Sequence, residues 1–316
     1  MRLHKLFAIT LIFMLSVSIV GFFIQKWRAK TAVLSESDKL LEVAFLDVGQ
    51  GDASLIVTPG GKTILVDGGP SANAELINTA GRMKYNLDAG SEIIIPFLKE
   101  NKIKHLDYVI ISHRQIDHIG GLISVLKNVR VKNIIEKPSR LSIPEYKEIQ
   151  KIAKEKRINY ISVKPYEVLK TGDPLVRVEF FDSKKTSSGK VSDEDNSSLL
   201  MKLTYNKTVL LFAGDVGQEA ELDLVTTYKD KLKASVLKVP NHGSRTSSSN
   251  PFLDMVKPGI LVISCGKQNP FGYPHEETLD RYSNRGLPVY RTDSDGTIVL
   301  VSDGTTHSIR GTIGIK

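Results

Sequence analysis

Two histidines and one aspartate lie within six residues of this chain, at His113, Asp117 and His118. Imidazole and carboxylate groups are common protein ligands of divalent metals such as zinc and manganese. A lone histidine is more often structural than catalytic, but three such groups in one short segment can point at a common centre. The spacing therefore predicts part of a metal site. Asp117 can serve it both as a ligand and as the group that accepts a proton from an attacking water.

The residues around this segment predict a strand, a loop and a helix. Residues 108–111 are apolar and mostly β-branched, as in a short buried strand. Gly120 and Gly121 then open a helical pattern of apolar residues that begins at Leu122. A loop between a strand and a helix can aim several side chains at one point, and the helix N-terminus adds partial positive charge.

Other metal-binding side chains also follow predicted strands, namely Asp67, Asp215, His242 and His275. Alone, Asp67 would be read as a turn cap. The predicted strands cover residues 41–48, 53–58, 62–66, 108–111, 131–135, 160–163, 175–181, 198–205, 208–213, 235–239, 260–264, 288–291 and 297–301. Predicted helices cover residues 92–99, 144–156 and 218–225 and begin at 122 and 276. If the strands share one orientation, their ends form a rim at which these side chains meet.

The composition is that of an ordinary globular protein, with 41% hydrophobic and 25% charged residues. A single cysteine, Cys265, excludes an intramolecular disulfide scaffold and a cysteine-rich zinc site. The net charge of +8 is concentrated at the N-terminus, because residues 1–30 hold five basic residues and no acid. The rest of the chain has 38 basic and 35 acidic residues, which is a weak argument for nucleic-acid binding.

The chain is expected to begin with a membrane-directed segment. Residues 6–24 carry no charge and are flanked by basic residues, and as a helix they would reach roughly 28 Å, about the thickness of a bilayer core. We interpret residues 1–30 as a signal anchor, or as a signal peptide if they are cleaved, with a buried helix as the weaker alternative. Residues 31–39 read as a linker, residues 40–316 as one catalytic domain outside the cytoplasm, and residues 183–196 as a polar surface loop.

Several motifs resemble one branch of the metallo-β-lactamase superfamily, the hydrolase domain of ComEC-type DNA-uptake proteins. Residues 112–121 are similar to the signature loop His-x-His-x-Asp-His, with Gln115 where the second histidine usually stands. The other motifs, in chain order, are FLDVGQGDA (45–53), LVDGG (65–69), DNSSLL (195–200), LFAGD (211–215), LKVPNHGSRTS (237–247), NPFGYPH (269–275) and VYRTDSDGT (289–297). The resemblance covers residues 40–302.

The resemblance implies an αββα sandwich of two mixed sheets, with a metal site along one edge that holds one or two divalent ions, zinc or manganese. The implied metal ligands are His113, Asp117, His118, Asp215 and His275. The implied catalytic residues are Asp117 and His242, and His242 fits either a ligand or a general acid that protonates the leaving oxygen. The side chains expected beside the metal or the substrate are Asp67, Gln115, Asn196, Ser244 and Arg245.

Departures from the family pattern weaken one side of this implied site. Gln115 is neutral at a ligand position, and Asn196 stands where many members have a histidine. Asn241 and Tyr273 also replace histidines that are often found in these loops. One tightly bound ion, with a second bound weakly or not at all, is therefore expected.

Three functions remain open from the sequence. The leading hypothesis is an anchored, extracytoplasmic metal-dependent phosphodiesterase or nuclease that acts on DNA or nucleotides and is linked to DNA uptake. The second is a hydrolase of another ester, such as a lactone or a cell-wall phosphodiester, since a fold does not determine a substrate. The third is a degenerate binding or scaffold module without turnover, which Gln115 favours and the retained histidines oppose. The hydroxyl-rich loop around Ser244 and Arg245 suits phosphate contact or is simply solvated.

Overall fold

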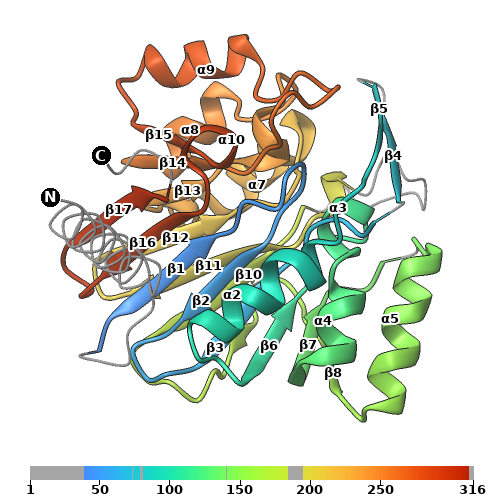
Figure 1. The fold of residues 1–316 in the computed structure, drawn as a ribbon. Coiled ribbons are helices and arrows are strands. Elements are labelled where there is room, and N and C mark those ends of the chain that lie inside the picture. The colour runs from blue at the N-terminus through green and yellow to red at the C-terminus, as the bar shows by residue number, and fades with distance from the viewer. Residues whose placement is uncertain (1–38, 73, 79–80, 140, 184–194, 313–316) are drawn as a thin grey trace, which may run out of the picture. The chain divides into compact units, whose positions relative to one another are not determined.

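Eight strands form the first of two mixed sheets, in the order β17-β16-β1-β2-β3-β6-β7-β8 (Figure 1). They are β1 (Leu41–Phe45), β2 (Ser54–Val57), β3 (Thr63–Val66), β6 (His105–Ile110), β7 (Arg130–Glu136), β8 (Asn159–Ser162), β16 (Ile298–Ser302) and β17 (His307–Gly311). Strands β3, β6, β7 and β8 pair in parallel, and the other pairs are antiparallel. The carboxyl ends of β3 and β6 therefore lie at the same edge.

Seven strands form the second sheet, in the order β15-β14-β13-β12-β11-β10-β9. They are β9 (Val168–Leu169), β10 (Arg177–Phe181), β11 (Leu200–Tyr205), β12 (Thr208–Phe212), β13 (Val236–Lys238), β14 (Ile260–Ile263) and β15 (Val289–Arg291). Strands β12 to β15 run parallel to one another. Their carboxyl ends supply a second set of loops at one edge.

This computed structural model describes residues 39–72, 74–78, 81–139, 141–183 and 195–312. The expected apolar segment 1–30, nearly all of the linker 31–39 and most of the loop 183–196 lie outside these ranges. Within the described ranges, no helix has both the length and the apolar character needed to cross a bilayer.

Helices flank both sheets (Figure 1). On the first sheet lie η1 (Gly90–Ile94), α2 (Ile95–Glu100), α3 (Ile116–Ile119), α4 (Leu122–Asn128) and α5 (Pro144–Glu155). On the second lie α7 (Gln218–Tyr228), α8 (Asn250–Val256), α9 (Glu276–Ser283) and the short α10 (Thr292–Asp295). Single turns occur at η2 (Asp195–Ser197), η3 (Lys229–Leu232) and η4 (Pro240–Gly243).

Alternation along the strands of the second sheet creates two separate cores. Leu210 and Val236 pack between the two sheets, together with apolar residues of the first sheet. Their neighbours Leu211 and Leu237 point the other way and pack against the helices of the second layer. This period of two is the ordinary consequence of a strand that is buried on both faces. The described body is thus layered as helices, sheet, sheet and helices.

Most predicted elements are present within two or three residues of their predicted bounds. The exceptions include a two-stranded hairpin, β4 (Glu75–Asn78) and β5 (Gly81–Lys84), in a region predicted to hold one helix and a loop. Strands β9 and β17 and helix α8 were also not predicted. These segments are short or strongly polar, so their periodicity is weak, and tertiary pairing decides their conformation.

Candidate metal centre

The candidate ligands come from loops that follow parallel strands in both sheets. In the first sheet, Asp67 follows β3, and His113, Asp117 and His118 follow β6. In the second sheet, Asp215 follows β12 and His242 follows the adjacent β13. Close packing of the first-sheet loops needs glycine, because a Cβ at Gly121 would lie 2.2 Å from the carbonyl oxygen of Gly68. The topology therefore brings side chains far apart in sequence to one edge.

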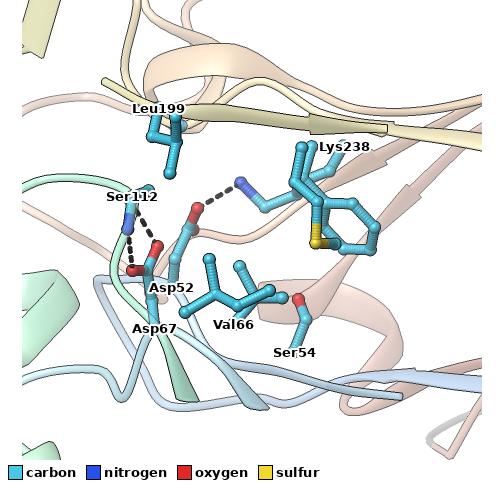
Figure 2. Close-up of a pocket in the computed structure, with 11 residues that line it drawn as sticks. Asp52, Ser54, Val66, Asp67, Ser112, Leu199 and Lys238 are labelled. Atoms are coloured by element: carbon cyan, nitrogen blue, oxygen red, sulfur yellow. Dashed lines mark hydrogen bonds and ion pairs between the residues drawn. The ribbon is translucent and has the colours of Figure 1, made fainter. Parts of the chain in front are cut away.

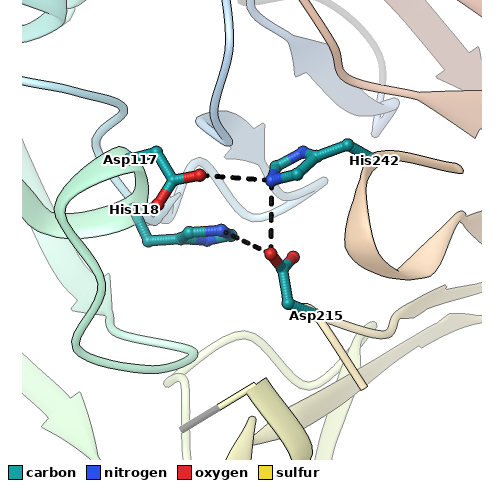
Figure 3. A group of neighbouring side chains, drawn as sticks. All are labelled: Asp117, His118, Asp215 and His242. Carbon is teal, nitrogen blue, oxygen red and sulfur yellow. Dashed lines mark ion pairs between the residues drawn. The ribbon is translucent and has the colours of Figure 1, made fainter. Parts of the chain in front are cut away.

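Four of these side chains converge on one buried point (Figure 3). Ligand atoms of Asp117, His118, Asp215 and His242 all lie within 4.8 Å of one another. One Asp215 carboxylate oxygen lies 3.3 Å from His118 Nε2 and 3.2 Å from His242 Nε2, and His242 Nε2 lies 3.3 Å from an Asp117 oxygen. The His113 ring is beside this group, with its centroid 4.0 Å from that of His118. The donor set is three imidazoles and two carboxylates.

Hydrogen bonds on the far side of each ring fix which nitrogen faces this point. His118 Nδ1 donates to Asp67 Oδ2 at 2.9 Å, and His242 Nδ1 donates to the Ser264 carbonyl at 2.9 Å. The Ser112 hydroxyl donates to Asp67 at 2.7 Å, so it accepts from His113 Nδ1 at 3.0 Å. All three Nε2 lone pairs are left for the centre, which is the usual arrangement of histidines that bind a metal.

Several atoms of this group form no hydrogen bond within the described residues. They are His113 Nε2, His118 Nε2 and His242 Nε2, of which the last two have only the ion-pair contacts given above, and the Oδ1 atoms of Asp117 and Asp215, whose Oδ2 atoms make those contacts. Each buried polar atom without a partner costs about 1–3 kcal/mol. A divalent cation held by Asp117, His118, Asp215 and His242 would bind atoms of this group that no hydrogen bond satisfies. The residues present therefore fit a zinc or manganese ion, and the donor chemistry does not distinguish the two.

The carboxylates of the centre favour positively charged groups beside them. Burial opposes protonation of His118 and His242, yet the neighbouring carboxylates, Asp215 foremost, raise both pKa values well above the ordinary range. Burial likewise opposes ionisation of Asp215, but the same two rings hold its pKa well below its ordinary value. His113 behaves differently, because burial and the His118 charge lower its pKa to about 3. A bound cation would replace the two imidazolium protons.

A buried ion pair, Asp52 with Lys238, lies next to the ligands (Figure 2). Lys238 Nζ lies 2.7 Å from Asp52 Oδ2, and the other Asp52 oxygen lies 3.3 Å from His242 Nδ1. Both side chains line a small cavity between the two sheets, together with Asp67 and Ser112. Asp52 and Lys238 were not predicted as site residues. Each occurs within a quoted motif, but no local signal pairs two residues 186 positions apart.

The ligand loops contain non-glycine residues with left-handed backbone. Asp67 has a φ of 58°, and the neighbours Asn241 and His242 have φ values of 47° and 52°. Such conformations cost on the order of 1–3 kcal/mol each and persist where the surroundings determine them. At His242 this backbone turns the imidazole back toward the centre directly after the short strand β13.

The remaining predicted residues surround the centre without joining the four-ligand group. The Gln115 amide donates to Asp195, a half-buried carboxylate whose pKa is raised well above its ordinary value by desolvation and by the charges of Asp215 and Asp117. Asp195 was quoted in a motif but not predicted to act. Asn196 accepts a hydrogen bond from the Gly217 N–H at 3.0 Å and so ties down the loop that follows Asp215.

His275, Ser244 and Arg245 lie together in the next layer of loops. His275 Nδ1 accepts a hydrogen bond from the Arg245 backbone N–H at 3.1 Å. Its ring meets Tyr273 edge-on at 5.3 Å, and Tyr273 in turn lies 5.9 Å from the His242 ring. The structure therefore does not bring His275 into the four-ligand group. The Arg245 guanidinium is exposed and lies 3.4 Å from Glu277.

Comparison with known proteins gives the family. Residues 46–267 match the metallo-beta-lactamase superfamily. The chain is 29% identical over 267 residues to ComE operon protein 3 of Bacillus subtilis. The aligned region is 81% of this chain and 32% of that protein. It is 30% identical over 258 residues to recombination protein 2 of Haemophilus influenzae, and this region is 81% of this chain and 28% of that protein. The chain thus spans about a third of the length of the curated relatives it matches.

Solved structures are similar at low sequence identity. The metallo-beta-lactamase fold protein YhfI from Bacillus subtilis is 13% identical with a TM-score of 0.49, over 79% of this chain and 96% of that one. Unliganded yeast PDE1 is 14% identical with a TM-score of 0.47, over 80% of this chain and 98% of that one. With the family match over most of the described body and a centre whose donor atoms suit a divalent ion, this chain belongs to the metallo-beta-lactamase superfamily of metal-dependent hydrolases.

Proposed function

We propose that this chain is a metal-dependent phosphodiesterase that acts on DNA or nucleotides. The observation that carries the hydrolase part is the convergence of four buried side chains, Asp117, His118, Asp215 and His242, whose ligand atoms lie within 4.8 Å of one another. The phosphodiester part is supported by the relatives, whose names refer to competence and recombination, two processes that act on DNA.

Each residue of the centre has a distinct proposed task. His118, His242 and Asp215 hold the ion, and we assign His242 to coordination because its Nδ1 is occupied by the Ser264 carbonyl. Asp117 orients the attacking water and accepts its proton. A bound divalent ion would supply a water of lowered pKa and polarise the scissile bond. Arg245 is exposed on the loop after His242, and we propose that it contacts a phosphate of the substrate.

The site is proposed to hold one ion tightly. His118, Asp215 and His242 supply three ligands, and Asp117 lies beside them, which leaves a position on the ion for the attacking water. At the position of a second ion, Gln115 offers only a neutral amide, which already donates to Asp195. A second ion there would bind weakly, because ligand charge and basicity govern affinity.

Metal content and hydrolysis together test this function. The full chain would be purified in detergent, its metal measured by elemental analysis, and bis-p-nitrophenyl phosphate hydrolysis followed with zinc, manganese and magnesium. We expect close to one retained ion and metal-dependent turnover. A chain that keeps its metal but hydrolyses only a lactone or another ester supports the second hypothesis. A chain that neither retains metal nor turns over supports the scaffold module, which the Gln115 substitution favours.

We also propose that residues 6–24 anchor the chain in the membrane, with the catalytic body outside the cytoplasm. The uncharged run between basic flanks supports this topology. Protease added to intact cells should digest the body. Full protection in intact cells, with digestion only after lysis, would contradict it.

A further inference from the structure

Tyr85 is a buried residue to which the proposed function assigns no task. It follows β5 at the foot of the β4–β5 hairpin, and its N–H donates to the Ala74 carbonyl at 2.8 Å. Its side chain is 2% exposed. Its hydroxyl has no hydrogen-bond partner among the residues that the structure describes. A buried hydroxyl in this state costs about 1–3 kcal/mol, so it calls for an explanation.

Other buried tyrosines of this chain do have partners. The Tyr205 hydroxyl donates to the Lys39 carbonyl at 2.7 Å, and the Tyr228 hydroxyl donates to the Asp182 carbonyl at 2.8 Å. The Tyr282 hydroxyl donates to Ser248 Oγ at 2.6 Å. Burial of a phenol in this fold therefore normally comes with a hydrogen bond, and Tyr85 departs from that pattern.

The hairpin that leads to Tyr85 packs against α3, the helix that carries two of the candidate ligands. Tyr85 belongs to the same core cluster as Ile116, the residue before Asp117, and as Tyr273, whose ring lies 5.9 Å from that of His242. Figure 1 shows the hairpin beside α3, the helix that carries Asp117 and His118. After burial, the largest influences that raise the Tyr85 pKa are the charges of Asp117 and Asp215. With its pKa raised, the phenol keeps its proton and can act as a hydrogen-bond donor.

We propose that the Tyr85 hydroxyl donates a hydrogen bond to a nonbridging oxygen of the phosphodiester bound at the metal centre, which makes it a further catalytic residue. This proposal rests on the proposed function. No proton is transferred: the phenol stays neutral and stabilises charge that grows on the oxygen in the transition state. This role explains why the Tyr85 hydroxyl has no hydrogen-bond partner in the free protein. A donor that is already free does not have to break another hydrogen bond when the substrate binds.

The test compares Tyr85→Phe with the control Tyr205→Phe in the full chain. Tyr205 is 5% exposed and lies at the end of β11 that is far from the centre. For Tyr85→Phe we expect unchanged metal content, an unchanged or higher Tm, and a kcat on bis-p-nitrophenyl phosphate that falls about 10- to 100-fold with little change in KM. For Tyr205→Phe we expect a lower Tm, because a made hydrogen bond is lost, with kcat preserved.

Phosphate binding separates this proposal from the proposed function. Inorganic phosphate is titrated calorimetrically into the metal-loaded wild-type chain and the metal-loaded Tyr85→Phe variant, and we expect weaker binding by the variant. If wild-type hydrolyses the diester and the variant keeps its kcat, the Tyr85 role is wrong and the proposed function stands. If wild-type hydrolyses no diester, the proposed function fails, and equal phosphate affinities would then overturn the Tyr85 role as well. A variant that loses its metal would show that Tyr85 is structural.

Discussion

Replacing Lys238 by methionine should strongly destabilise the fold. The ammonium lies 2.7 Å from Asp52, and both side chains are nearly inaccessible, with 2% and 8% exposure. Methionine keeps the length and packing of the side chain and removes only the charge. The change leaves the Asp52 carboxylate buried in the cavity between the sheets (Figure 2), with His242 Nδ1 at 3.3 Å as a remaining neighbour.

The expected cost of Lys238→Met is about 3–5 kcal/mol, the usual penalty for leaving one charge of a buried pair uncompensated. A domain is typically stable by only about 5–15 kcal/mol. For a chain of this size the loss corresponds to a drop in Tm on the order of 10 °C. Breaking the pair thus removes a large fraction of the stability, even though the intact pair adds little over an apolar core.

The pH dependence of the penalty has a definite sign. Burial raises the pKa of Asp52, but Lys238 and His242 outweigh it, so the folded value lies below the unfolded one. The wild-type pair therefore contributes stability above the unfolded aspartate pKa of about 3.9 and loses it as pH falls through the folded value. Without Lys238, Asp52 takes up a proton more readily. The difference between wild type and variant should be largest near neutral pH and shrink in acid.

Urea unfolding of chelator-treated protein at pH 7 and pH 4 measures both effects. The double variant Asp52→Asn, Lys238→Met should recover much of the lost stability, because no unpaired charge then remains, and the cycle gives a coupling energy for the pair. A single variant within about 1 kcal/mol of wild type at pH 7 would refute the reasoning. It would mean that water reaches the cavity and solvates Asp52.

Further predictions concern the metal. Because neighbouring carboxylates raise the pKa values of His118 and His242 well above the ordinary range, metal binding should release protons, and competition titrations with a chelating dye should give a higher affinity at pH 8 than at pH 6. Because the pKa values of His118 and His242 are higher in the folded state than in the unfolded state, the metal-free protein should lose stability as pH rises through the folded values. Calorimetry measures this as a lower Tm. Asp117→Asn should lower kcat by about 10²-fold, whereas Asp215→Ala should mainly lose metal on elemental analysis; wild-type turnover by Asp117→Asn would contradict the site. Gln115→His should strengthen a second ion, measured as stoichiometry after dialysis, and two ions retained by wild type would contradict the one-ion site.

Much of the fold follows from local periodicity. The predicted strand 208–213 is β12 at Thr208–Phe212, and the predicted helix 144–156 is α5 at Pro144–Glu155. Each of these two segments has a clear hydrophobic periodicity, which is enough to predict its secondary structure without knowledge of its neighbours. The strand predictions also indicated where the ligands would meet, because parallel strands have their carboxyl ends at one edge of a sheet.

Features that depend on contacts between distant segments could not be predicted. The Asp52–Lys238 pair joins two sheets across 186 residues, and a lysine in a strand is ordinarily assumed to reach solvent. The orphan hydroxyl of Tyr85 is visible only when every neighbour has been placed. Hydrogen-bond satisfaction is a property of the packed structure, and local pattern carries no information about it.

The choice between His242 and His275 illustrates how topology decides what motif spacing leaves open. Both histidines follow strands of the second sheet, and the family resemblance implied His275 as the ligand. Strand β13 is the direct neighbour of β12, which carries Asp215, so the loop after β13 places His242 Nε2 at 3.2 Å from that carboxylate. His275 comes from the long loop after β14, one strand further away. Its Nδ1 accepts a hydrogen bond from the Arg245 N–H, so the neutral ring carries its proton on Nε2 and has no lone pair left for a metal, unlike His242, whose Nδ1 donates. Adjacency in the sheet, which the sequence does not state, therefore favours His242 as the ligand and leaves His275 to position the loop that carries Arg245.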